Sequence, residues 1–129
     1  MADLKKEWTH ARKQAFIKAG LRAASRRWPP RYETLAEAKR GKRTNPKSGR
    51  LAEHYQCAEC LGAYPAKDVQ VDHIKAIIDP EVGFIDWNTV IERMFCDKEN
   101  LQVLCTGCHG QKTKAERDLA TKRKKANGK

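Results

Sequence analysis

The feature that constrains this chain most is a pair of Cys-x-x-Cys motifs. Cys57 and Cys60 form the first motif, Cys105 and Cys108 form the second, and residues 61–104 separate the two. Each motif can present two thiolates from a tight turn, and four thiolates match the tetrahedral coordination that Zn2+ adopts in structural sites. An ion bound by both motifs would close a long insertion and join its two ends. The sequence therefore predicts a structural zinc site around which the middle of the chain folds.

The cysteines have two other interpretations: they could be buried thiols, or one motif could be a redox pair. The beginning of the chain has a charged helical pattern and lacks the apolar core of a secretory signal, which indicates a reducing compartment, the cytoplasm, and disfavours disulfides. Cys96 has no partner cysteine in sequence, and we expect a small buried apolar residue there, with a stray ligand as the alternative. His54, shortly before Cys57, could substitute as a ligand.

The charges of the 129 residues are unevenly distributed. Residues 1–50 carry 15 basic and 4 acidic side chains, residues 51–104 carry 4 and 10, and residues 105–129 carry 8 and 2, within a total net charge of +11. Basic flanks around an acidic middle indicate a polyanion as partner, with DNA as the default choice. No recognition helix is evident, so we expect backbone contacts with weak sequence preference. No apolar run is long enough to cross a membrane, so no membrane partner is expected.

The periodicity of apolar residues predicts an α+β fold of short elements. Residues 3–26 have a helical repeat that Trp28-Pro29-Pro30 must end, because proline removes an amide donor and restricts the residue before it. The other expected elements are a short helix over 32–40, a basic linker over 41–50, strands over 51–56, 69–74 and 101–104, a helix over 87–95 with Asp86 as its N-cap, and a final helix from about Thr106.

Some side chains of these elements have a structural interpretation. Leu4, Trp8 and Phe16 could pack the first helix against the core while its polar face binds DNA. His10 has no sulfur nearby and is expected to be solvated, and the basic tail over 122–129 lacks an apolar stripe and is expected to be disordered when free. The apolar residues that should pack the helix over 87–95 onto the core are Trp87, Val90, Ile91, Met94 and Phe95.

Chemistry-bearing residues lie between and beside the two cysteine motifs. Hydrolysis of a phosphodiester needs a base that activates water and a divalent cation that neutralises charge on the phosphate oxygens. His73 is the candidate base, because an imidazole is neutral near pH 7. Asp72 and His109 offer one hard oxygen and one imidazole to the cation. An Asp-His pair is ordinarily a surface pair, but its combination with His109, directly after Cys108, favours a catalytic site.

The sequence around these residues resembles the HNH endonucleases, especially the small zinc-stapled ones encoded by bacteriophages. The resemblance covers about residues 54–115 and rests on Val71-Asp72-His73-Ile74, on Glu99 to Cys105, and on Cys108-His109 followed by Lys112-Thr113. It implies a beta-beta-alpha-metal (His-Me finger) fold, in which a hairpin carries the Asp-His pair and the next helix delivers the last histidine. It also implies that Asn100 bonds the backbone across the loop and orients His73.

The resemblance implies a division of the chain into three parts. These are a basic helical arm and linker over 1–50, an HNH nuclease core with the cysteine motifs over 51–115, and a basic tail over 116–129. Arg93 and Lys112 are the candidate phosphate contacts, with a salt bridge within the insertion as the alternative for Arg93 and a solvated side chain as the alternative for Lys112.

The implied function is a metal-dependent endonuclease that hydrolyses DNA phosphodiester bonds with low sequence specificity, by nicking or by double-strand cleavage. Zn2+ would be structural, and Mg2+, Mn2+ or Ni2+ catalytic. The likeness to phage members extends the expected partners to phage packaging (terminase) proteins in the cytoplasm of a bacterial host cell, for a monomer or weak homodimer. The alternatives are a non-catalytic zinc-binding DNA-binding module and an RNA-directed nuclease or RNA binder, although no aromatic stacking platform supports the last.

Overall fold

The computed structural model describes residues 7–127, which form a mixed α/β fold with two small antiparallel sheets. Short 3-10 turns over Ala66–Asp68 and Lys98–Asn100 precede β4 and β5. The elements are α1 (His10–Ser25), α2 (Pro29–Glu37), β1 (Lys39–Thr44), β2 (Leu51–Gln56), β3 (Ala63–Pro65), β4 (Val69–His73), α3 (Trp87–Met94), β5 (Leu101–Cys105) and α4 (Thr106–Ala126).

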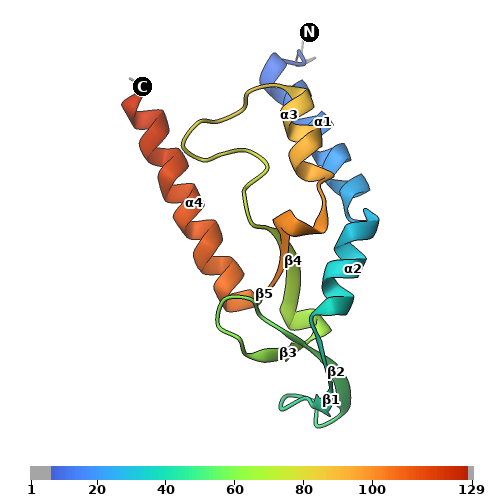
Figure 1. Ribbon diagram of the computed structural model, residues 1–129. Helices are drawn as coiled ribbons and strands as arrows, with labels where there is room; N and C mark the ends of the chain where they lie inside the picture. Colours follow the sequence, from blue (N-terminus) through green and yellow to red (C-terminus); the bar gives the residue numbers. More distant parts are fainter. Residues whose placement is uncertain (1–6, 128–129) are drawn as a thin grey trace, which may run out of the picture.

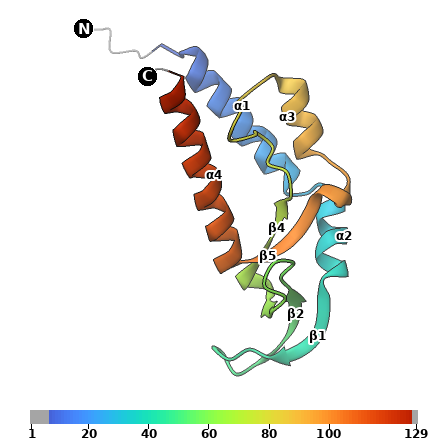
Figure 2. The same cartoon turned by 60° about the vertical axis from the view of Figure 1, so that its left-hand side comes forward.

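The two-stranded sheet lies at the centre of the molecule. Strands β4 and β5 run between the long α4 on one side and α2 on the other, as both views show (Figures 1 and 2). Their register pairs Val69 with Cys105 and Asp72 with Gln102, so the Asp-His pair ends the strand at the end away from the second cysteine motif. The three-stranded sheet, in the order β1-β2-β3, lies at the opposite end of the molecule from α3 (Figure 1).

The first two helices are defined by a cap and by prolines. The Thr9 side chain accepts a hydrogen bond from the Arg12 amide at 3.2 Å, so α1 begins at His10. The predicted helical start was therefore wrong for residues 7–9, while residues 3–6 lie outside the described part of the chain. The prolines end α1 as expected, but Pro29 also opens α2, because its fixed φ suits the first helical turn. The expected helix over 32–40 is thus displaced by about one turn.

The first helix packs on the core through a different residue than expected. Trp8 and Phe16 are 55% and 71% exposed and stack edge to face on each other at 6.2 Å. Leu21, one of the last apolar residues of α1, instead packs against the buried cluster around Met94. Leu4 lies outside the described residues. The expected packing on the core through Trp8 and Phe16 is therefore wrong, because both aromatic side chains are exposed.

The insertion helix was correctly predicted. The Asp86 carboxylate caps α3 by accepting from the Thr89 amide at 2.7 Å, and this hydrogen bond lowers the pKa of Asp86. Val90 and Met94 are fully buried, but Ile91 faces solvent, contrary to expectation. The cluster that α3 forms consists of Ile77, Val90 and Met94, with Leu21, Ile78, Phe84, Trp87 and Phe95 packed around it.

Two segments expected to be irregular are regular. The stretch over 41–50 is largely β1 and its turn, since Arg43 pairs with Ala52 and Thr44 with Leu51. Its turn is closed by the Asn45 side chain, which accepts from the Lys47 amide at 2.9 Å, and by Gly49 at a φ of +75°. The basic tail is helical through Ala126 because α4 continues unbroken from the core and its lysines and arginines are good helix formers. Within residues 7–127, no helix is long and apolar enough to cross a membrane.

We expect Met94→Ala to lower the free energy of unfolding by about 2–5 kcal/mol, because the side chain is fully buried and its removal leaves a cavity. The matched control is Ile91→Ala on the same helix, where the side chain is 43% exposed and the cost should stay below about 1 kcal/mol. Urea denaturation of the zinc-loaded chain measures both. Equal losses in the two variants would contradict this assignment of the core.

Candidate active site and metal site

The four cysteines of the two motifs converge on one point. Their sulfur atoms all lie within 4.8 Å of one another, and the Cys60 and Cys105 sulfurs are 3.9 Å apart. Zn–S bonds of about 2.3 Å place the sulfurs of a tetrahedral site about 3.8 Å apart. The donor set and its spacing therefore fit a metal such as zinc. The second motif straddles the junction of β5 and α4, and the first follows β2.

Backbone amides shape this cluster. The Ala58 amide donates to the Val103 carbonyl at 2.8 Å, which ties the first motif to β5. Burial raises the pKa of Cys57, but amide hydrogen bonds to its sulfur outweigh burial and lower that pKa to about 6. The Tyr64 hydroxyl, 3.2 Å from the Cys60 sulfur, lowers the pKa of Cys60. Thiolates are the form that binds metal, so these contacts favour a cation.

The pKa of the fourth cysteine, Cys108, shifts in the opposite direction. Its hydrogen bond with Cys105 raises the pKa of Cys108 to about 12, because four neighbouring sulfurs cannot all be charged without a cation. His54 stands apart from the cluster, buried and bonded through Nδ1 to the Ala52 carbonyl at 2.8 Å. Cys96 is half-buried beside Asn100, and His10 is exposed on α1.

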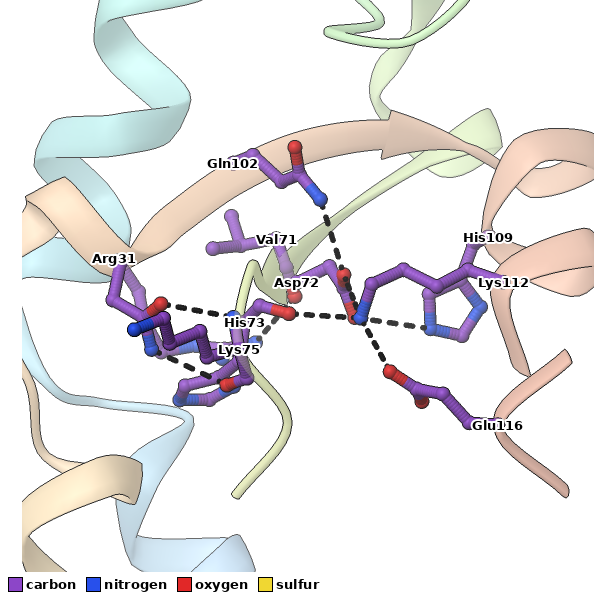
Figure 3. Close-up of polar contacts among 10 residues, drawn as sticks. Arg31, Val71, Asp72, His73, Lys75, Gln102, His109, Lys112 and Glu116 are labelled. Carbon is purple, nitrogen blue, oxygen red and sulfur yellow. Dashed lines mark hydrogen bonds and ion pairs between the residues drawn. The ribbon is translucent and has the colours of Figure 1, made fainter. Parts of the chain in front are cut away.

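The acidic and imidazole groups expected to share a second ion also lie together. Asp72 is the penultimate residue of β4 and His109 lies in the first turn of α4. His109 Nε2 is 3.8 Å from Asp72 Oδ1 (Figure 3). An ion about 2.0 to 2.2 Å from each atom spans such a gap. Gln102, opposite Asp72 on β5, donates to the other carboxylate oxygen at 3.4 Å.

Lys112 is held by three oxygens beside this pair. Its Nζ lies 3.0 Å from Asp72 Oδ2, 2.9 Å from the His73 carbonyl oxygen and 2.8 Å from Glu116 Oε2 (Figure 3). Burial lowers the pKa of Lys112, but the two carboxylates outweigh burial and raise it. Sequence reasoning missed Glu116. Its spacing of one helical turn from Lys112 is the signal that could have found it.

His73 is fixed by the last residue of α3. Its Nε2 lies 3.1 Å from the Met94 carbonyl oxygen, which only accepts, so Nε2 carries the proton and Nδ1 keeps its lone pair in the neutral ring. Burial lowers the pKa of His73, partly opposed by the hydrogen bond to Met94. A histidine in this state is neutral at pH 7 and can accept a proton.

Asn100 makes backbone hydrogen bonds across the loop that follows His73. Its Oδ1 accepts from the Lys75 amide at 2.9 Å, and its Nδ2 donates to the Lys75 carbonyl at 3.3 Å. Its own carbonyl accepts from the Ile74 amide at 2.8 Å. These three bonds hold the chain immediately after His73.

A cavity of about 310 Å3 lies beside Asp72, His73 and His109, and neither Asn100 nor Gln102 is part of its lining. Arg22 of α1 lies on its wall, a contribution from a distant element that no local motif could have indicated. Arg93 is absent from the lining, and its guanidinium donates to the Ile77 carbonyl at 3.5 Å. The charged and titratable side chains of the lining are Arg22, Asp72, His73, His109, Lys112 and Glu116.

Part of the chain is similar to a curated phage protein. The chain is 36% identical over 64 residues to a probable HNH endonuclease of Lactococcus phage SK1. The matched region covers 50% of this chain and 60% of the phage protein. No family model and no solved structure matches the chain. The likeness supports a nuclease role at the level of the HNH family.

We expect the purified chain to contain about one tightly bound zinc ion, and Cys60→Ser to lose it. Cys60 is exposed, so its substitution disturbs packing least, and loss of metal should lower the melting temperature because metal binding contributes folding free energy. Metal analysis and thermal denaturation measure the two effects. Cys96→Ser is the matched control and should keep the ion. Zinc content unchanged in Cys60→Ser would contradict a four-cysteine site.

Proposed function

We propose that this protein is a divalent-metal-dependent endonuclease of the HNH type that hydrolyses DNA phosphodiester bonds. The observation that carries the proposal is the 3.8 Å approach of His109 to Asp72 directly beside His73. The likeness to a probable HNH endonuclease supports it independently. Two antiparallel strands followed by a helix, β4, β5 and α4, are the order of elements of a beta-beta-alpha-metal unit, which we propose as the core fold.

The proposed ion site uses one oxygen of Asp72 and one nitrogen of His109. A divalent ion there, Mg2+, Mn2+ or Ni2+, supplies Lewis-acid stabilisation of phosphate charge when bound. Oδ1 of Asp72 faces His109 while Oδ2 faces Lys112, so the carboxylate can serve both partners at once. Lys112 then remains beside the ion, where its ammonium can contact a phosphate oxygen.

The proposed base is His73. Its free Nδ1 takes a proton from a water molecule, and the hydrogen bond from Nε2 to the Met94 carbonyl then stabilises the charged ring. Asn100 acts as a positioning residue, because it fixes the backbone that follows His73. Among the basic residues, Lys112 and Arg22 line the cavity, which supports them as the proposed phosphate contacts. Arg93 remains a sequence-based prediction for that role.

Substrate and partners follow from charge and resemblance. The net charge of +11 favours DNA that is bound through its backbone with low sequence specificity. Zinc at the four cysteines serves as a structural ion in this proposal. The division into residues 1–50, 51–115 and 116–129 remains a proposal, with β1 of the first part paired to β2 of the second. Association with packaging proteins, a cytoplasmic location and a monomeric or weakly dimeric state remain predictions.

We expect the wild-type chain to cleave plasmid DNA only when a divalent cation is added, and His73→Ala to lower the rate by about 100-fold or more. The control is His10→Ala, an exposed histidine of α1, which should cleave at the wild-type rate. Gel analysis of plasmid conversion measures the rates. If wild type and His73→Ala showed the same residual cleavage while both bound DNA, the non-catalytic zinc-binding DNA-binding module would be the better description.

We expect Asn100→Ala to lower the cleavage rate by about 10- to 100-fold through displacement of His73. Asn100→Asp keeps the acceptor for the Lys75 amide and loses the donor, so its rate should lie between those of Asn100→Ala and wild type. Single-turnover cleavage at saturating DNA measures the rates, with zinc content and DNA affinity as controls. A wild-type rate in Asn100→Ala would exclude the positioning role.

A further inference from the structure

We propose a second DNA site in this chain, a pocket between the β1–β2 hairpin and the N-terminus of α4 that binds a phosphodiester and its adjoining sugar. The pocket, about 610 Å3, is larger than the cavity at Asp72 and His109. Figure 2 shows the hairpin lying beyond the end of α4 at which the helix begins. The inference rests on the proposed function, because it extends the surface on which the same DNA strand lies.

A buried histidine opens into this pocket. His54 is only 4% exposed, and its Nδ1 donates to the Ala52 carbonyl at 2.8 Å. Its Nε2 has no hydrogen-bond partner among residues 7–127. Every fully buried side-chain nitrogen or oxygen in this part of the chain has a partner, so Nε2 must reach solvent, and His54 lines the pocket. The Nε2 of this largely buried ring is therefore available to a ligand in the pocket.

A buried asparagine adds a second free group. Asn45 is 5% exposed and also lines the pocket. The Lys47 amide occupies its Oδ1 at 2.9 Å, which leaves the Nδ2 donor without a partner in the described part of the chain. By the same reasoning as for His54, this donor reaches solvent, and Asn45 is one of the residues that line the pocket. Two largely buried side chains, His54 of β2 and Asn45 of the turn after β1, thus line the same pocket, and each has a nitrogen without a partner in residues 7–127.

The charges around the pocket favour an anion. Arg43 and Lys47 line it, against the single carboxylate of Asp68. Thr106 and Gly107, the first residues of the 21-residue α4, lie on the opposite wall, and the first amides of a helix have no acceptor within the helix. These donors suit a phosphate oxygen.

The remaining walls suit a sugar rather than a free ion. Pro46, Tyr64 and Pro65 contribute apolar surface to the pocket. The Tyr64 ring is held in place by the hydrogen bond of its hydroxyl to the Cys60 sulfur. A DNA strand alternates charged phosphates with deoxyribose sugars. The basic side of the pocket suits a phosphate, and the apolar wall beside it suits the adjoining sugar.

The pocket lies at a spacing that one DNA strand can span. Thr106 lines the pocket and His109 lines the active-site cavity, and both belong to the first turn of α4. Three residues of helix extend about 4.5 Å along the axis, and successive nucleotides of a strand advance by about 3.4 Å. A phosphate in the pocket therefore lies within a few nucleotides of a phosphate at His109. Holding it would position the scissile bond.

The test uses the full-length, zinc-loaded His73→Ala chain without added divalent cation, so that DNA binds and is not cut. Titration with a short double-stranded DNA oligonucleotide should give a saturable shift of the His54 ring signals in NMR spectra. Adding Arg43→Gln and Lys47→Gln should weaken DNA binding about tenfold, lower the salt slope of log affinity by about 1, and abolish the His54 shift. Both side chains are exposed, so the fold should be kept, as unchanged zinc content would show.

The matched control is the pair Lys124→Gln and Lys125→Gln, which removes the same charge at the far end of α4 and should leave the His54 shift intact. No His54 shift at saturating DNA, or an equal shift in both double variants, would overturn the proposal. A shift with inorganic phosphate that DNA does not reproduce would also overturn it. Cleavage by the wild-type chain is measured separately. A His54 shift without cleavage would contradict the proposed nuclease function and support the second DNA site. Cleavage without the His54 shift would contradict only the second DNA site.

Discussion

The arrangement of this protein depends on the meeting of its two cysteine motifs. Cys105 ends β5 and also caps α4, because its sulfur accepts from the Cys108 amide at 3.4 Å. The position of the cluster therefore sets both where the strand ends and where the helix begins. His109 follows in that same first turn, so the group that holds the fold together also places a candidate ligand of the second site.

Burial of apolar side chains alone contributes little to holding these strands and helices together. The two buried clusters are small, one around Cys57, Leu104 and Cys105 and the other around Ile77, Val90 and Met94. Small hydrophobic cores commonly rely on metals or disulfides for added stability. The second cluster has a direct consequence for chemistry, because it fixes the end of α3, whose Met94 carbonyl in turn orients the His73 ring. Packing of the insertion and the state of the candidate base are thus connected through one hydrogen bond.

The interpretations from sequence succeeded where the signal was local. The capping of α3 by Asp86, the strand before His73 and the start of α4 near Thr106 follow from residues within a few positions of each other. Irregular structure was predicted too readily in basic segments. Lysine and arginine are compatible with an edge strand such as β1 and with a long helix such as α4, so a run of charge does not indicate disorder when neighbouring structure can extend through it.

The sequence by itself determined which groups are available: four thiols in two paired turns, an Asp-His pair, an asparagine and a histidine after the second motif. Only the tertiary structure decided which other residues lie next to these groups. Lys112 contacts the carboxylates of both Asp72 and Glu116, Arg22 of α1 lines the same cavity, and His54 lines a pocket beside the N-terminus of α4. Apart from the Lys112–Glu116 pair within α4, these contacts join residues from separate elements, and no spacing along the chain encodes them, because they arise from how helices and strands pack across one another.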